Sequence, residues 1–183
     1  MLFRAIIFWS LCCAPAWAAQ DVASKRFALP GQGFLELQAP ANWLAIVRQP
    51  TNQAPPTIVL GPMQGLQFEI SLTPSWPMKA DESASAEKAA RERVGRLAED
   101  IKQNVVERNL DIVKLKGSSG TGFYFSATDK SPKPMEYKFV TQGIVNVARI
   151  TVGFTILTHE GQGDVVAAAL AMLKTAKHIP PAR

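Results

Sequence analysis

Catalysis and metal binding need several polar side chains at one place, and this chain of 183 residues offers few candidates. His159 and His178 are its only histidines. A helix is predicted between them, and about 19 residues of helix would separate them by about 28 Å. No further ligand lies three or four residues after His159, whereas His178 suits the carboxyl end of a helix, where positive charge is favourable. The sequence therefore predicts no catalytic residue, no metal site and no cofactor site.

The segment 117–122, Gly-Ser-Ser-Gly-Thr-Gly, is as rich in glycine as the loops that bind phosphate. In those loops the chain runs from a strand into the amino end of a helix, whose backbone N–H groups bind the anion. Here a strand is predicted to follow from Phe123 instead. We therefore interpret the segment as a hairpin turn.

Five lysines lie among the predicted strands and turns of residues 111–140: Lys114, Lys116, Lys130, Lys133 and Lys138. If the strands that carry them are neighbours, Lys114, Lys116 and Lys138 share one outer face, with the other two at a nearby turn. Such a face would contact an anionic surface of the cell envelope or an acidic protein. The alternative is that the lysines protect a sheet edge from aggregation.

Two tryptophans lie close to prolines, an arrangement that can form a recognition surface. Trp43 ends the turn Pro40–Ala41–Asn42–Trp43 and is predicted to lie in the core. Trp76 stands between Pro74 and Pro77, ahead of a predicted helix, and is expected to be more exposed. We therefore take Trp76 as a candidate partner contact.

Residues 1–18 have the three parts of a secretory signal peptide. Arg4 supplies positive charge, residues 5–13 are mostly apolar, and Ala16–Trp17–Ala18 precedes a cleavage site. The apolar stretch is shorter than the roughly 20 residues that span a membrane. Cys12 and Cys13, the only cysteines, allow the alternative of a lipoprotein, but neither follows the small residue that lipoprotein processing favours. We expect a secreted, periplasmic protein without disulfides.

Residues 19–183 are predicted to form one domain, since neither an internal repeat nor a linker interrupts them. The whole chain carries a net charge of +5, and loss of Arg4 leaves +4. This mild charge lacks the clustering typical of nucleic-acid binding. No later apolar run is long enough to cross a membrane.

Most of the predicted elements are strands joined by short links, which favours an antiparallel sheet. Apolar and polar residues alternate over 66–73, as in a strand with one buried face. The longest segment, 145–157, needs a bulge near Ala148–Arg149 to place all its apolar side chains in the core. The predicted strands are 26–29, 34–38, 44–48, 57–60, 66–73, 111–116, 122–128, 135–140 and 145–157.

Helices are predicted over 83–108 and 162–177, where apolar residues recur every three or four positions. Asp81 or Ser83 would cap the first helix, and Asn109 would end it in a left-handed conformation. Its apolar stripe is expected to pack on Phe68 and Ile70. That stripe consists of Ala90, Val94, Leu97, Ile101 and Val105. The fold class is thus α+β, a single-domain sandwich of a mainly antiparallel sheet with a long amphipathic helix and a C-terminal helix.

This order of elements resembles the PsbP-like fold family, which includes bacterial periplasmic proteins of the DcrB type. The resemblance rests on the Pro40–Trp43 turn, the alternating strand 66–73, the helix 83–108, Gly122–Phe123–Tyr124 at a strand start, and the closing strand and helix. It implies a noncatalytic binding or assembly factor and brings no functional residue with it.

We therefore expect an accessory protein of the cell envelope that acts through contacts with an unknown envelope protein or an anionic surface, without nucleic acid. One alternative is a carrier of a small apolar ligand or lipid, with a cavity lined by Phe68, Phe125, Phe139 and Phe154. Another is a simple metal-independent hydrolase with convergent carboxylates in a deep cleft.

Overall fold

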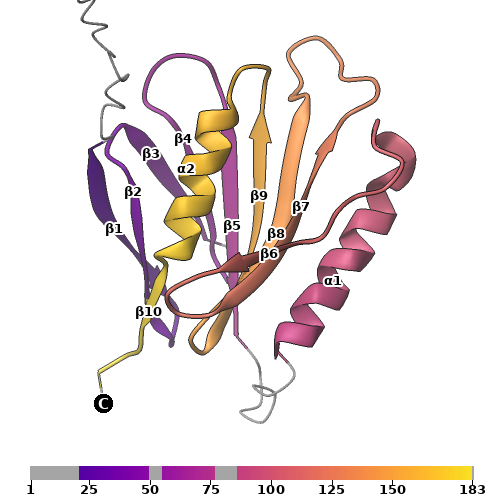
Figure 1. Cartoon of the computed structure of the whole chain (residues 1–183). Coiled ribbons are helices and arrows are strands. Elements are labelled where there is room, and N and C mark those ends of the chain that lie inside the picture. The colour runs from indigo at the N-terminus through magenta and orange to yellow at the C-terminus, as the bar shows by residue number, and fades with distance from the viewer. Residues whose placement is uncertain (1–20, 50–54, 77–85, 183) are drawn as a thin grey trace, which may run out of the picture.

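The structure is a computed structural model that describes residues 21–49, 55–76 and 86–182 (Figure 1). The predicted signal peptide and the predicted cap residues Asp81 and Ser83 lie outside the described residues.

A seven-stranded antiparallel sheet forms the centre of the molecule. Its strands follow the order β3-β4-β5-β9-β8-β7-β6. Short links join most sequential neighbours, as the pattern of turns predicts. The strands are β3 (Trp43–Arg48), β4 (Thr57–Pro62), β5 (Glu69–Ser75), β6 (Val113–Lys116), β7 (Thr121–Thr128), β8 (Phe139–Val147) and β9 (Ile150–Thr158).

A second sheet of three strands contains β1 (Val22–Leu29), β2 (Gly33–Pro40) and β10 (Lys177–Ile179) in the order β1-β2-β10. The predicted glycine turn between its first two strands is confirmed, since Gly31 and Gly33 have φ values of 68° and 85°. A Cβ atom on Gly33 would come within 2.1 Å of the carbonyl oxygen of Ile179, so only glycine fits beside β10. β10 itself was not predicted, because three residues before two prolines carry no periodicity.

Two α-helices lie on opposite sides of the large sheet: α1 (Ala86–Ile101), followed by the 3-10 turn η2 (Lys102–Asn104), and α2 (Gly163–Lys174). The predicted end of the first helix near Asn109 is wrong. Val105 is already extended, and among the described residues only Met135 and Ala148 combine a side chain with a left-handed φ. The chain leaves the helix early because the backbone N–H of Val106 donates to the carbonyl oxygen of Thr128, at 2.8 Å.

The predicted long strand with a bulge is also wrong. The segment 145–157 divides into the end of β8 and most of β9, joined by a tight turn at Ala148, whose φ is 53°. Val145 pairs with Val152 across this hairpin, so both side chains lie on the same face of the sheet. The change of parity that suggested a bulge is the change from one strand to the next.

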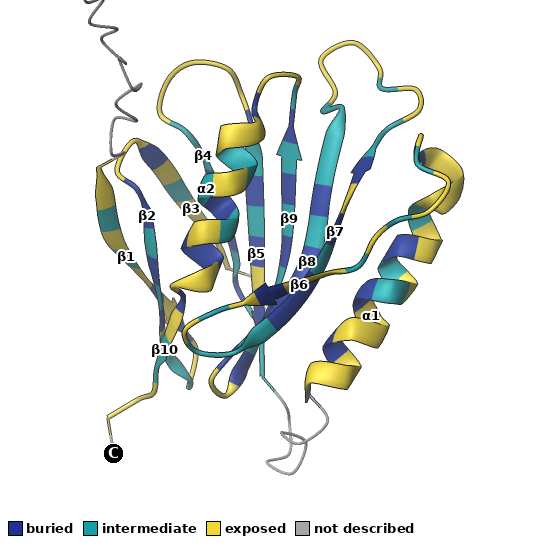
Figure 2. Cartoon of the chain, viewed as in Figure 1, coloured by how far each residue is buried: buried dark blue, intermediate teal, exposed yellow. Residues whose placement is uncertain are grey.

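The large sheet separates two hydrophobic cores, which appear as buried bands along the strands in Figure 2. The main core lies between this sheet and the layer formed by the small sheet and α2, and it contains Phe68 and Ile70. The second core lies under α1 and contains Phe123 and Phe125. The predicted contact of the α1 stripe with Phe68 and Ile70 is therefore wrong, because those residues face the other way.

Candidate binding surface

The described elements cover only part of one face of the large sheet. α1 packs mainly on β7 and β8, while α2 and the small sheet lie on the opposite face (Figure 1). The strand register aligns one row of residues across this face: Ile46, Val59, Ser71, Thr155, Gln142 and Phe125. Because Phe125 belongs to the core under α1, the whole row lies on the α1 side. We call the part of this side on β3, β4, β5 and β9 the uncovered face.

The uncovered face combines a hydroxyl-rich centre with an apolar edge. Ser71 and Thr155 lie side by side at its centre, and Thr73 beside them is exposed. At the edge, Leu44 and Ile46 of β3 are 51% and 63% exposed. Apolar side chains this exposed on a sheet face favour a contact with another molecule.

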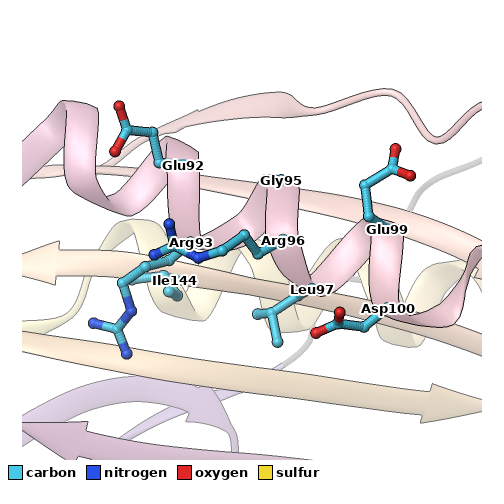
Figure 3. A pocket seen from close by; sticks show the side chains of 8 residues that line it. All are labelled: Glu92, Arg93, Gly95, Arg96, Leu97, Glu99, Asp100 and Ile144. Carbon is cyan, nitrogen blue, oxygen red and sulfur yellow. The ribbon is translucent and has the colours of Figure 1, made fainter.

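A groove of about 800 Å³ runs beside the uncovered face, between α1 and Ile144 of β8 (Figure 3). Leu97 and Ile144 supply its apolar part, and Arg93, Arg96 and Asp100 supply charge. In Figure 3 the side chains of Arg93 and Asp100 extend from the helix toward the neighbouring strands.

The two glutamates that line the groove are paired with lysines. Glu92 lies 3.9 Å from Lys88 and Glu99 lies 3.2 Å from Lys102, and in Figure 3 both glutamates extend from the opposite edge of α1 to Arg93 and Asp100. Among the described residues Arg93, Arg96 and Asp100 form no ion pair, so two positive charges and one negative charge of the groove stay unpaired. This arrangement suits a partner with an apolar segment flanked by acidic groups.

The three predicted contact lysines do not form one patch. Lys114 and Lys116 lie on β6, opposite Phe123 and Thr121. Lys138 lies beyond the other end of β7, where its carbonyl accepts the N–H of Asp129. About six strand residues, or about 20 Å, separate the two places. The expectation that the three lysines lie together as one patch is therefore wrong.

Two of these lysines also have acidic neighbours. Lys114 donates to Glu87 of α1 at 2.6 Å, and Lys138 pairs with Glu160, whose carboxyl pKa is lowered by the hydrogen bond and by the charge of Lys138. Paired lysines present less positive charge to an anionic surface. A role of Lys114, Lys116 or Lys138 in binding stays a prediction.

The two tryptophans differ in burial. Trp43 is only 4% exposed and its ring lies 5.1 Å from that of Phe68, so its predicted place in the core is confirmed. Trp76 is half-buried and packs against the same core, at the end of the described segment 55–76. Its remaining exposed part keeps it a candidate contact.

A cluster of titratable side chains lies where β5 begins and β9 ends. The sequence pattern does not predict this cluster. The rings of Tyr137 and His159 are 4.9 Å apart. Burial raises the pKa of Tyr137, and the nearby carboxylate of Glu69 raises it further. These residues come from distant parts of the chain, and the pairing of Glu69 with Leu157 and of Phe139 with Thr158 brings them close.

The glycine-rich segment 117–122 is the predicted hairpin turn, between β6 and β7. The N–H of Gly117 donates to the carbonyl of Gly120 at 2.9 Å, and a Cβ on Gly120 would come within 2.2 Å of the Asn146 carbonyl oxygen. The glycines therefore permit close approach of backbones. Within the described ranges, no three His, Cys, Asp or Glu side chains are grouped as metal ligands would be, and no helix has the length and apolarity needed to span a membrane.

The four phenylalanines proposed for a ligand cavity do not meet. Phe68 and Phe154 lie in the main core, whereas Phe125 lies in the core under α1, on the other face of the sheet. Phe139 lines a smaller hollow of about 200 Å³ with Tyr137. The prediction of a single cavity lined by all four phenylalanines is therefore wrong.

No family model matches the sequence, and no curated protein matches it. Solved structures of other proteins do resemble its fold, among them the following three. A protein of Bacteroides thetaiotaomicron VPI-5482 is 13% identical, with a TM-score of 0.55; the match covers 85% of this chain but only 48% of that protein, so the chain spans about half its length. The cyanobacterial PsbP protein CyanoP of Synechocystis sp. PCC 6803 is 12% identical over 92% of this chain and 99% of its own, with a TM-score of 0.51.

LpqN of Mycobacterium tuberculosis, a protein involved in cell envelope biogenesis, is 12% identical over 87% of this chain and 92% of its own, with a TM-score of 0.53. At such identities the likeness concerns the fold and not the activity. Both the element order and the sheet arrangement agree with the family resemblance seen in the sequence. The chain therefore has a PsbP-like fold.

Proposed function

We propose that the protein is an exported, noncatalytic accessory protein of the cell envelope, located in the periplasm, that binds another envelope protein. The partly covered sheet face and its groove are the observation that carries this proposal. In a domain whose other sheet face is covered by α2 and the small sheet, a half-covered face with exposed Leu44 and Ile46 is a surface suited to a partner. LpqN, which shares the fold, is a protein of cell envelope biogenesis.

The groove defines the chemistry of that partner. Its arginines would meet acidic side chains, and its floor of Leu97 and Ile144 would meet an apolar one. Burial of aromatic or aliphatic anchors beside paired charges is typical of protein interfaces. An acidic protein segment with apolar residues fits this combination better than a bare anionic surface.

The alternative of a lipid carrier loses its specific support, since its four phenylalanines lie on two faces of the sheet. The alternative of a hydrolase needs convergent acidic groups. In the groove, Glu92 and Glu99 diverge from Asp100 (Figure 3). The binding function therefore has the better support.

Site-specific photo-crosslinking in cells tests the proposal. A crosslinking residue at Arg96 or Thr73 should capture one defined envelope protein, whereas the same residue at exposed Ser24 of β1, outside the groove and the uncovered face, should not. The double variant Arg93→Glu/Arg96→Glu, which reverses the sign of both positive charges of the groove, should abolish capture at Thr73. Equal capture at Ser24, or capture unaffected by the reversal, would contradict the proposal, as would turnover of a substrate by the purified protein.

A further inference from the structure

The described residues place four strands at sheet edges, and three of these edges are protected against pairing with another strand. β6 has four residues, with Lys114 and Lys116 among them. β1 carries Lys25 and Arg26, and β10 has only three residues. Short edge strands and edge lysines are the usual means of preventing sheet-to-sheet association.

The fourth edge, β3, lacks these features. It is six residues long and pairs with β4 on one side, and no described strand pairs with the other side. Between Trp43 and Val47 it has no charged residue and no proline. Leu44, Ile46 and Val47 are between 45% and 63% exposed. An unpaired backbone edge with exposed apolar side chains is suited to receive another strand.

We propose that this strand is β3 of a second copy of the chain, paired antiparallel about a twofold axis that passes through Ala45 perpendicular to the sheet. A twofold interface requires a surface that complements itself. In this register Leu44 of each copy lies opposite Ile46 of the other, on the uncovered face, and Trp43 lies opposite Val47. Ala45 lies opposite Ala45.

The charges permit this pairing. Arg48 is the only charged residue of β3, and the twofold axis places the two copies of Arg48 at opposite ends of the strand pair. They are then about six residues, or about 20 Å, apart. This separation exceeds the Debye length of about 8 Å at physiological salt, so their repulsion is screened.

Pairing would join the uncovered faces of two copies into one continuous surface. This inference goes beyond the proposed binding function, because a monomer could bind a partner through the groove alone. The interface of one strand pair is small and we expect a dimer that dissociates on dilution. Loss of the dimer and loss of partner capture are measured separately.

Disulfide trapping of the full exported chain tests the register. Cys12 and Cys13 are first replaced by serine, so that Ala45→Cys introduces the sole thiol. Opposed residues of an antiparallel pair have Cα atoms about 4.5–5.5 Å apart, within the range that a disulfide spans. We expect Ala45→Cys to form covalent dimer about tenfold faster than Val113→Cys on the edge strand β6, since pairing raises the local thiol concentration.

Light scattering over a range of protein concentrations gives the second readout. The unmodified chain should change from monomer to dimer as concentration rises, and Ile46→Lys should stay monomeric while Val113→Lys behaves like the parent. Circular dichroism checks that each variant is folded; if Ile46→Lys does not fold, the disulfide comparison decides alone. Equal trapping at Ala45 and Val113, or a parent chain that is monomeric throughout, would overturn the proposal.

Discussion

Glu107 fixes the chain that follows α1 to the end of β7. Its carboxylate accepts the backbone N–H of Thr128 at 2.9 Å and the hydroxyl of Thr128 at 2.7 Å. Burial acts to raise the pKa of Glu107, but the two hydrogen bonds from Thr128 outweigh it and the pKa is lowered. The ionised form is therefore the one that stabilises the fold, and its contribution is complete above the ordinary pKa of about 4.5.

We expect Glu107→Gln to lower the free energy of unfolding at neutral pH by about 1 kcal/mol, because the amide keeps the shape but weakens two charge-assisted hydrogen bonds. The folded-state pKa is depressed, so this stabilisation is lost as the pH falls below 4.5 through the folded pKa. Urea melts at several pH values should therefore show that the difference in unfolding free energy between the parent and Glu107→Gln disappears in acid. Glu99→Gln, at an exposed position, is the control. A difference that persists in acid would contradict the role given to ionised Glu107.

At the scale of elements, α1 shows how far an apolar pattern predicts packing. Ala90 and Val94 of the predicted stripe are buried, as expected. Leu97 and Ile101 are half-buried at its margin, and Ala98, which the stripe omitted, is only 6% exposed. Small residues thus face the sheet along the helix axis, which brings α1 close to Phe123 and Phe125. The spacing of the apolar residues predicts the helix, and it predicts the buried side of the helix to within one residue. It does not predict which face of the large sheet the helix covers.

Val94→Ala should therefore lower the free energy of unfolding by about 2 kcal/mol, since its side chain is fully buried. Arg93→Ala, on the groove side of the same helix, should change it by less than about 0.5 kcal/mol. Urea melts give both values. The two substitutions also separate stability from function, because only Arg93→Ala is expected to weaken partner capture in a folded protein. Similar losses of stability at both positions would mean that the helix is rotated.

Local sequence patterns predict the structural features that depend on residues close together in the sequence. The β1–β2 hairpin, the buried face of β5 and the turn at 117–122 follow from alternation and glycine placement. The groove, the uncovered face and the Tyr137–His159 cluster depend on strand order, which joins β5 to β9 across nearly half of the chain. Such pairings leave no local periodicity, so the sequence predicts other contact residues, the lysines and Trp76, and not this surface.

On the scale of the whole molecule, the lysines test whether charge directs the protein to an anionic surface. Each lysine near such a surface contributes about 1 kcal/mol within a Debye length of about 8 Å. Since Lys138 lies about 20 Å from the β6 pair, the sites should act independently. We expect Lys114→Gln/Lys116→Gln and Lys138→Gln to reduce sedimentation with anionic vesicles separately, and only at low salt. Unchanged sedimentation in the triple variant would assign these lysines to edge protection.

The last prediction concerns where the protein works. If residues 1–18 are a signal peptide, the protein made with its own leader should be recovered from the periplasm with Ala19 as its first residue. It then lacks both cysteines, and its net charge is +4, because Arg4 is the only charged residue removed. The intact mass of the protein isolated from the periplasmic fraction identifies its first residue and so shows whether both cysteines are absent.

A lipoprotein would instead begin at Cys12 or Cys13 and carry the added mass of acyl chains. The variant Ala18→Arg should block cleavage before Ala19, since a large charged residue replaces the small one beside the cut, and the uncleaved chain should stay with the membrane. Ala23→Arg, within β1, adds the same charge beyond the cut and should leave cleavage intact. Recovery of the chain from the cytoplasm with its leader intact would remove the basis for an envelope function.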